Sequence, residues 1–468
     1  MLHSGAVTDH PGVSGTTTPS APSGAAPAAG APPRHLRRGL GVLTLAATIF
    51  IFISSGPYGL EAMVREAGPG AAALMLVVAL VFWGMSHALV ASELASAVPE
   101  EGGFVRWIGM AFGDFWGFQA GWWYWIKMLA DTSIYPILFC EYLKYWFPDL
   151  PVDGQRLVRL AVIWIFIGIN LRGIRTGGRL AVLFTLFLLS PFLWFIVQGL
   201  PQVGVAAFTP FLAEGKPPLA ALGTGLLIGM WCYNTLDSVS IVAGEVRDPT
   251  RTYGRAYALA IPVIVLTYLL PVIVGSALDP AYLSWEDHQF TKIGLALGGG
   301  WLGGWIALGG LASNLSIFHG ALMVNTRVPF VLASARRFPR VFAALSERHG
   351  TPWVSLLFDG AVYSVIALMA ESFVNIIIGI QWLNMGIYTL LYLAFLRLRR
   401  TRPDLPRRFT VPGGWPGALA ICSGPFLICW IGIPVGGLPM ITQGGLALLS
   451  GPIAAVVLGG FRPWRRAG

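Results

Sequence analysis

Apolar residues dominate the chain from residue 40 onward, in runs of about 20 residues that short polar segments separate. A helix of that length crosses the hydrocarbon core of a bilayer, so the repeated runs predict an all-α polytopic membrane protein. We expect twelve transmembrane helices. Their predicted ranges are residues 40–67, 71–98, 115–145, 157–171, 180–198, 220–246, 256–278, 301–325, 353–370, 375–398, 418–433 and 444–461.

The first span is interrupted where the centre of the bilayer should lie. The interrupting residues are Ser54, Ser55, Gly56, Pro57, Tyr58 and Gly59. An unpaired backbone group at this depth costs several kcal/mol unless it lies within protein or against a polar cavity. The glycines let a ligand approach the backbone, and the proline suits the first position of a second half-helix. The stretch is therefore either part of a substrate site or a proline kink in a packed helix.

The sixth span has a second interruption, at Tyr233, Asn234, Thr235, Leu236 and Asp237. Each interruption opens a block of five spans, and because five is odd, the two blocks enter the membrane with opposite orientations. This arrangement is typical of inverted-repeat transporters, which bind substrate at the midplane between their broken helices. We expect a disordered cytoplasmic tail (1–36), a first repeat (37–198), an extracellular connection (199–219), a second repeat (220–400), and two last spans with a short cytoplasmic C-terminus (401–468).

Composition and charge agree with a membrane protein. Residues are 55% hydrophobic and 11% charged, whereas a soluble domain has about 25% charged residues. The net charge of +9 does not indicate nucleic-acid binding, because most of the 31 Lys and Arg residues lie in alternate loops, as the positive-inside rule requires. We expect a multi-pass protein of the plasma (cell inner) membrane with both termini in the cytoplasm.

Catalytic motifs are missing from the sequence. It contains no HExxH, no GxSxG and no His and Cys cluster with metal-ligand spacing. We therefore expect no enzyme activity, no cofactor and no metal.

Two carboxylates lie at the interruptions, Glu61 one turn after the first and Asp237 at the end of the second. A charge at the centre of a membrane helix costs roughly 2.5–3.5 kcal/mol, so each needs a partner or a purpose. A ligand with separated amines would satisfy both. The structural alternatives are an acid at the positive end of a half-helix for Glu61 and a helix N-cap for Asp237. Both are also candidates for proton coupling, because a dry cavity disfavours the charged form of an acid.

Asp131 lies in the third span and either contacts substrate or forms an ion pair with Lys127, four residues earlier. If the ligand is an amino acid, free amides near Gly56 to Tyr58 would bind its carboxylate. Backbone carbonyls around Trp231, Tyr233 and Asn234 would bind its ammonium group.

Four further charged residues are candidates for an inner gate. Glu93 and Glu245 lie near the inner ends of the second and sixth spans, beside Arg-rich loops. Arg251 and Arg255 are their expected salt-bridge partners.

Several motifs together resemble the amino acid, polyamine and organocation transporter superfamily, in particular its branch of polyamine uptake and L-type amino acid transporters. They are Ser55-Gly56-Pro57-Tyr58-Gly59-Leu60-Glu61, Glu93-Leu94 with Pro99 and Gly102-Gly103, Asp131 with Tyr135-Pro136, Asp237-Ser238 with Ala243-Gly244-Glu245-Val246, Pro249 and Arg251-Thr252, and Pro403 with Val411-Pro412-Gly413-Gly414. The resemblance implies a leucine-transporter-like fold of two inverted five-helix repeats with discontinuous first and sixth helices.

The resemblance also implies a function. We expect secondary active import of polyamines or other cationic amines and amino acids, by alternating access and with a proton favoured over sodium as the coupling ion. The alternatives are a neutral or cationic amino acid transporter or exchanger, and a substrate sensor that does not transport. The expected partners are a small-molecule amine or amino acid, the coupling ion and the lipid bilayer, while the oligomeric state stays open.

Overall fold

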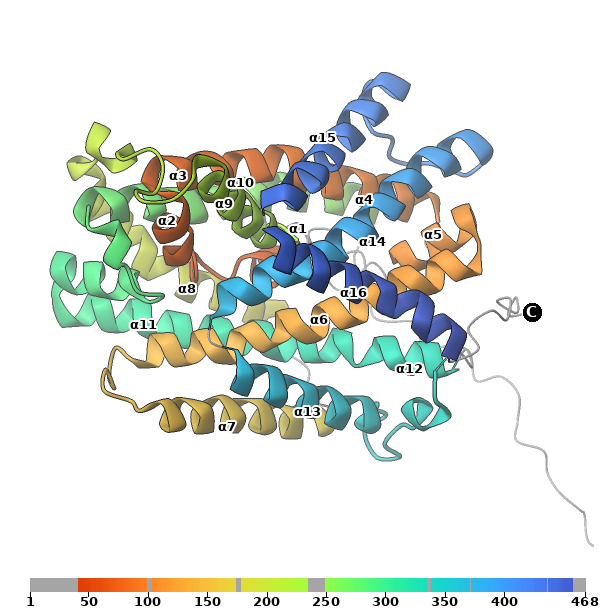
Figure 1. The fold of residues 1–468 in the computed structure, drawn as a ribbon, viewed down its shortest axis with the longest axis horizontal. Helices are drawn as coiled ribbons and strands as arrows, with labels where there is room; N and C mark the ends of the chain where they lie inside the picture. The colour runs from red at the N-terminus through yellow and green to blue at the C-terminus, as the bar shows by residue number, and fades with distance from the viewer. Residues whose placement is uncertain are drawn as a thin grey trace, which may run out of the picture. The chain divides into compact units, whose positions relative to one another are not determined.

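The computed structural model describes residues 41–98, 103–173, 178–234, 249–334, 338–370, 372–435 and 437–457. All regular secondary structure in these ranges is helical (Figure 1), which confirms the expected all-α class. The predicted tail, residues 1–36, lies outside them, as do Asp237 and Glu245.

The helices follow one another with few intervening residues. They are α1 (Val42–Ile53), α2 (Glu61–Ala67), α3 (Pro69–Ala79), the π-helical turn η1 (Leu80–Gly84), α4 (Met85–Ala97), α5 (Gly103–Phe112), α6 (Asp114–Leu143), α7 (Val152–Leu171), α8 (Gly178–Gly199), the 3₁₀ turns η2 (Leu200–Gln202) and η3 (Val205–Phe208), α9 (Pro218–Cys232), α10 (Pro249–Leu278), η5 (Tyr282–Ser284), α11 (Gln289–Asn325), α12 (Arg327–Ser334), η6 (Arg340–Ala343), α13 (Trp353–Met369), α14 (Phe373–Thr401), α15 (Gly414–Val435) and α16 (Gly437–Val457).

Five helical stretches of the described residues are long and apolar enough to cross a membrane. They are Pro69–Ala97, Val182–Gln202, Gly254–Leu278, Gln289–Ser334 and Phe373–Thr401. Large apolar side chains such as Leu183 and Leu193 on α8 are exposed, which suits contact with lipid and would be costly in water. The chain is thus a multi-pass membrane protein, while the count of twelve spans stays a prediction.

The interruption in the first span separates α1, which ends at Ile53, from α2, which begins at Glu61. Ser55 has a φ of +47° and Gly56 a φ of +110°, so the chain leaves helical geometry abruptly. A positive φ is uncommon for serine, and here its hydroxyl donates to the Ile51 carbonyl at 2.6 Å. At Gly56, a Cβ atom would lie 2.6 Å from the Tyr58 ring, so only glycine fits.

Two helices differ from the sequence-based ranges. α11 contains a break at Gly299, where φ is +74° and ψ is −172°, so it consists of two consecutive helices. The second begins beside the predicted start at Trp301, while the first, from Gln289, was not expected. α5, between the predicted second and third spans, was not expected as a helix. It buries Trp107, Ile108 and Ala111 on one face, and α6 and α14 pack against it.

The long helices α6 and α11 form the centre of the helix packing. α6 packs against α11, α14 and α13, while α1 packs against α8 and α10. The half-helix α2 lies against α9 (Figure 1). α1 ends at the first predicted interruption and α9 at the second. The C-terminal ends of these two helices lie in the same region of the protein, where Tyr268 contacts both.

Candidate functional site

A small cavity lies where α1 and α9 end. Its lining residues are Ile53, Ser54, Gly56, Tyr58, Leu60, Asp131, Tyr135, Leu138, Trp231, Cys232, Asn234, Tyr268, Ser313, Asn314 and Ile317. The cavity volume is about 40 Å³, which is small beside the roughly 300–1,000 Å³ of a ligand pocket.

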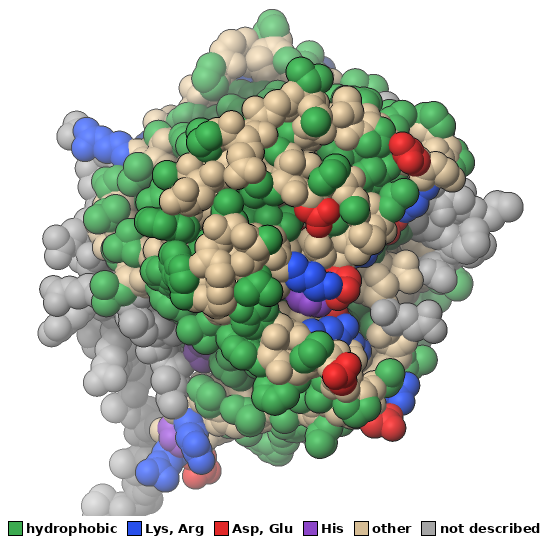
Figure 2. Space-filling model, turned by 90° about the vertical axis from the view of Figure 1, so that its left-hand side faces the viewer, with side chains coloured by type: hydrophobic (Ala, Val, Ile, Leu, Met, Phe, Trp, Pro, Cys, Tyr) green, Lys and Arg blue, Asp and Glu red, His purple; other side chains and the backbone are tan. Residues whose placement is uncertain are grey.

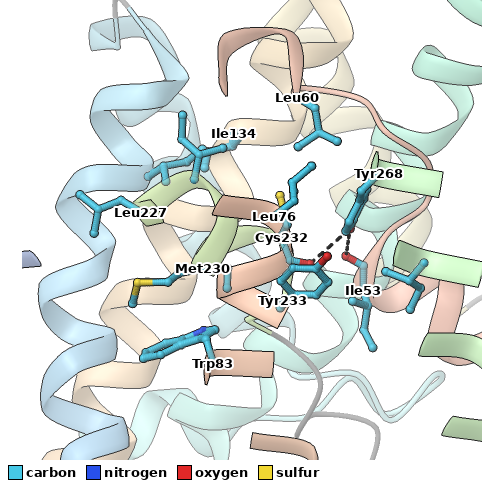
Figure 3. Packing of buried hydrophobic residues seen from close by; sticks show 14 of the residues in the cluster. Ile53, Leu60, Leu76, Trp83, Ile134, Leu227, Met230, Cys232, Tyr233 and Tyr268 are labelled. Atoms are coloured by element: carbon cyan, nitrogen blue, oxygen red, sulfur yellow. Dashed lines mark hydrogen bonds between the residues drawn. The ribbon is translucent and has the colours of Figure 1, made fainter. Parts of the chain in front are cut away.

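Tyr268 of α10 joins the two helix ends. Its hydroxyl lies 3.2 Å from the carbonyl oxygen of Ile53 and 3.2 Å from that of Cys232 (Figure 3). The last carbonyls of a helix have no partner within the helix, and one hydroxyl proton cannot fully serve both. Acceptor capacity thus remains at this point. Because a helix C-terminus carries about half a negative charge, two converging C-termini favour a cation.

Asp131 brings a carboxylate to the cavity from α6. The side chain is 5% exposed; Oδ1 accepts the indole N–H of Trp231 at 2.9 Å, and Oδ2 accepts the Tyr135 hydroxyl at 3.4 Å. Among the described lining residues it is the only acid. These contacts place Asp131 against the ligand space, while its ion pair with Lys127 stays a prediction.

Glu61 lies behind the interruption and is fully buried. Oε1 accepts the Tyr142 hydroxyl at 2.8 Å, and Oε2 accepts the Gly59 amide at 2.9 Å. The carboxylate therefore holds the turn between α1 and α2 and faces the positive end of α2, which is the structural alternative stated for it. It is not among the described residues that line the cavity, and its roles in substrate binding and proton coupling stay predictions.

Asn234 accepts hydrogen bonds through its side-chain oxygen and its carbonyl, while its Nδ2 has no hydrogen-bond partner among the described residues. Its Oδ1 accepts the Trp83 indole N–H at 3.1 Å, and its carbonyl accepts the Tyr388 hydroxyl at 2.8 Å. Tyr233 is buried with its ring 5.6 Å from that of Tyr268. These contacts fix the end of α9, and the residues that follow, from 235 to 248, lie outside the described part.

Tyr58 fills the wall of the cavity opposite α9. Its ring lies edge-on to Tyr142, with centroids 5.0 Å apart, and its hydroxyl has no hydrogen-bond partner among the described residues. A buried hydroxyl in this state is available to a ligand.

Glu93 lies near the C-terminal end of α4. Its carboxylate forms two ion pairs and accepts one backbone hydrogen bond. Arg399 lies 3.2 Å from Oε2, Arg407 lies 3.2 Å from Oε1, and the Val411 amide donates to Oε2 at 2.7 Å. The partners of Glu93 therefore come from the end of α14 and the segment after it. The sequence had instead suggested Arg251 or Arg255, which lie on α10. Arg255 is exposed, and the side chains of Glu245 and Arg251 lie outside the described part, so the gate stays a prediction.

The polar lining residues Tyr135, Tyr268, Ser313 and Asn314 were missed from the sequence, and so were Ile53, Leu60, Leu138, Cys232 and Ile317. The pair Ser313-Asn314 interrupts a run of glycines and apolar residues in α11, which was a usable signal. Tyr268 gave none, because a single tyrosine in an apolar span is usual. Among the described residues, no group of three or more His, Cys, Asp and Glu side chains is placed to hold a metal ion.

Apolar helices that surround a polar cavity at a helix interruption define a membrane transport protein. A sequence profile of the amino acid permease family matches residues 42–461, and the chain belongs to this family. It is thus a membrane transporter and not an enzyme, and the resemblance seen in the sequence is confirmed.

Curated relatives agree with this assignment. The polyamine transporter RMV1 of Arabidopsis thaliana is 33% identical over 422 residues, which cover 89% of this chain and 83% of the relative. The polyamine transporter PUT1 of Oryza sativa subsp. japonica is 32% identical, with 85% and 74% covered. The large neutral amino acids transporter small subunit 2 of Homo sapiens is 25% identical, with 76% and 68% covered.

Proposed function

We propose that the chain is a secondary active transporter that imports polyamines or other cationic amines and amino acids across the plasma membrane, by proton symport with alternating access. The observation that carries the proposal is the buried Asp131 carboxylate on the cavity wall. An ammonium group is the natural partner of an acid in this position, because a lone charge within the membrane is costly. The relatives named as polyamine transporters support the same substrate class.

The backbone around the cavity supports a cation as well. The carbonyl ends of α1 and α9 converge on it, and Tyr268 leaves part of their acceptor capacity unused. Charge-assisted hydrogen bonds from an amine to such carbonyls are about twice as strong as neutral ones. Asp131 and the two helix ends together form an amine subsite.

The competing proposal is amino acid transport, which the more distant relatives support. An amino acid also needs a subsite for its carboxylate, and the amides around Pro57 were its candidates. Of the candidate amides near Gly56 to Tyr58, that of Gly56 already donates to Ser54 Oγ at 3.2 Å. The following amide, that of Gly59, donates to Glu61. With a carboxylate already at the start of α2, a second anion there is disfavoured, so the amine is the better substrate. A sensor that does not transport is the proposal from another class.

Alternating access requires that the cavity open to each side in turn, and the two predicted five-helix repeats would provide the movement. On the predicted outer side, Arg65 of α2 donates to Asp287 at 2.8 Å and to the Trp285 carbonyl at 2.7 Å, and Glu66 pairs with Lys216. Figure 2 shows side chains of both charges and a histidine gathered in the middle of one face. Contacts of this kind hold α2, and opening of the outer side would break them.

The test is uptake of radiolabelled putrescine and of a mixed amino-acid panel into proteoliposomes, with an inward proton gradient or none. Putrescine uptake that needs the gradient supports the proposal. Uptake of amino acids without uptake of putrescine would show that the substrate is an amino acid and not a polyamine. Binding of either compound without uptake would favour a sensor that does not transport.

The matched pair of variants is Asp131→Asn and Asp153→Asn. We expect Asp131→Asn to reduce putrescine uptake at least about tenfold, because a charge-assisted bond contributes about 1.5–3 kcal/mol. Asp153 lies on α7 with its side chain 92% exposed, and its replacement should leave uptake unchanged. Equal uptake by both variants would show that Asp131 does not bind the substrate.

A further inference from the structure

Asp359 is a further buried carboxylate and is not among the described residues that line the cavity. It belongs to α13 and is fully buried, yet neither of its carboxylate oxygens has a hydrogen-bond partner among the described residues. Ser355, one turn earlier on the same face, is also fully buried, and its hydroxyl is likewise without a partner. Buried polar atoms in this state are rare and call for a ligand or a function.

The next turn of α13 shows the contrast. Tyr363 accepts a hydrogen bond from Asn325 of α11 at 3.4 Å, and the same amide donates to the Thr132 hydroxyl of α6 at 2.7 Å. The three helices thus meet in an ordinary polar contact at that level. At that level Asn325 Oδ1 also has no hydrogen-bond partner among the described residues, whereas at Asp359 both oxygens of an ionisable group have none.

A cluster of aromatic side chains lies beside Asp359 and includes its neighbour Trp125. The indole N–H of Trp125 on α6 faces the carboxylate without reaching hydrogen-bonding geometry. The Trp125 ring lies 5.3 Å from Phe338 and 5.8 Å from Phe358, and Phe342 of η6 packs on Phe358 at 5.4 Å. The segment around η6, on the side predicted to be inner, thus packs on Trp125 and Phe358, the two aromatic residues next to Asp359 in space and in sequence.

These surroundings suit a proton and not a metal ion. A hard cation takes about six or more oxygen ligands, whereas the described neighbours offer the carboxylate and the Ser355 hydroxyl. A proton needs one oxygen and removes the charge that the apolar surroundings disfavour. At Glu61, by comparison, both oxygens already accept hydrogen bonds, and these bonds stabilise the ionised form.

We propose that Asp359 is the proton-binding carboxyl of this transporter, which takes up a proton from the outer solution and releases it inside in each transport cycle. This inference rests on the proposed proton symport and assigns the coupling proton to α13. α6 connects the two sites, because it carries Trp125 beside Asp359 and Asp131 at the cavity. The two residues are six positions apart, or roughly 9 Å along a helix.

Substrate at Asp131 and a proton at Asp359 would therefore both bias the position of α6. A shared two-state element of this kind is what couples two sites. Movement of α6 away from η6 would expose the carboxyl to the inner side.

The elements that pack against α13 carry several titratable or charged side chains. They are Asp114, Tyr124, Lys127, Asp131, Tyr135, Cys140, Glu141 and Tyr142 on α6, Asp153, Arg156 and Arg159 on α7, Lys292 and His319 on α11, Arg327 on α12 and Arg340 in η6, and Tyr363 lies on α13 itself. Arg159 is the one with a direct contact to α13, since it donates to the Ala367 carbonyl at 2.9 Å. That bond lies two turns beyond Asp359 and does not reach its carboxylate.

The experiment compares two modes of transport by Asp359→Asn in proteoliposomes. Gradient-driven accumulation of radiolabelled putrescine needs net proton movement, and exchange of internal for external putrescine does not. We expect the variant to lose at least tenfold in accumulation, and the internal acidification that accompanies it, while exchange stays within about twofold of wild type. Asp153→Asn, the same change at an exposed position, should keep both.

Retained gradient-driven accumulation and acidification in Asp359→Asn would overturn the inference. If Asp359→Asn also lost exchange, the variant Trp125→Phe would be tested in its place. This change removes the indole N–H that faces the Asp359 carboxylate. We expect a shifted pH midpoint of uptake in Trp125→Phe, and an unchanged midpoint would overturn the inference. Wild-type uptake that ignores the gradient would instead contradict the proposed symport itself, so the two failures are distinguishable.

Discussion

Trp231 donates its indole N–H to Asp131 Oδ1 at 2.9 Å, and this bond joins the end of α9 to the middle of α6 across the cavity. Together with the Tyr135 hydroxyl, this bond holds the Asp131 carboxylate on the wall of the cavity. Positioning of a charged group by a second residue commonly decides how well it binds a ligand.

The first prediction concerns Trp231→Phe. The variant keeps the ring but loses the donor, so Asp131 is free to rotate. A hydrogen bond to a charged group contributes about 1.5–3 kcal/mol, and we expect the KM for putrescine uptake to rise about tenfold with a smaller effect on the maximal rate. The concentration dependence of uptake measures both.

Trp122→Phe is the matched control. Trp122 donates its indole N–H to Ser450 at 3.0 Å, between α6 and α16, so the variant loses a bond of the same kind away from the cavity. An equal rise in KM in both variants would show that the effect is not specific to Asp131.

The second prediction concerns Tyr268→Phe. Loss of the hydroxyl leaves the buried carbonyls of Ile53 and Cys232 without their shared donor. A buried acceptor without a partner costs about 1–3 kcal/mol, so we expect the unfolding temperature in detergent to fall and putrescine uptake to slow several-fold.

Tyr145→Phe serves as the comparison for Tyr268→Phe. Tyr145 donates to the Gly300 carbonyl at 3.1 Å in an exposed contact, where water replaces the lost donor. If both variants unfolded at the same temperature, the bridge between the two helix ends would not contribute to stability.

The third prediction concerns the buried ion pairs of Glu93, whose side chain is 1% exposed. Glu93→Ala leaves Arg399 and Arg407 without their carboxylate. Removal of one partner of a buried ion pair costs about 3–5 kcal/mol, and we expect a loss of this size in the free energy of unfolding, measured by denaturant titration in micelles.

An exposed ion pair provides the contrast to Glu93. Glu286 pairs with Lys292 with its side chain 53% exposed, and such pairs contribute about 0–1 kcal/mol. Glu286→Ala should therefore change the unfolding free energy little. Equal losses in the two variants would contradict the assignment of Glu93 to a buried structural contact.

The interruption of the first span was predictable because its signal is local. Two serines, two glycines and a proline within an apolar run cannot form a regular helix, and the structure ends α1 at Ile53. Asp131 was predictable for a similar reason, since a charge in a membrane span needs a purpose. The cavity residues on uninterrupted helices could not be predicted in this way, because Tyr268 and Tyr135 reach the cavity only through tertiary packing.

The partners of Glu93 show the same limit. Arg399 and Arg407 lie more than 300 positions later in the chain, and the positive-inside rule places basic residues on a side without saying which loop meets which helix. Asp359 was also overlooked in the sequence. A single acid in the apolar run 353–370 was visible there, but only the packing of α13 against α6 shows that its oxygens are without partners.

The last prediction concerns pH and His288, which lies in the loop between α10 and α11 on the predicted outer side. Burial lowers the pKa of this imidazole below its ordinary value, against the opposing effect of Glu286 at 3.5 Å. A histidine with a lowered pKa binds fewer protons in the folded state than in the unfolded state, so stability falls as the pH drops through the ordinary value near 6.5. We expect the unfolding temperature to decrease between pH 7.5 and pH 5.5, and His288→Asn to remove part of that decrease. A pH dependence that is the same in wild type and His288→Asn would show that other groups cause it.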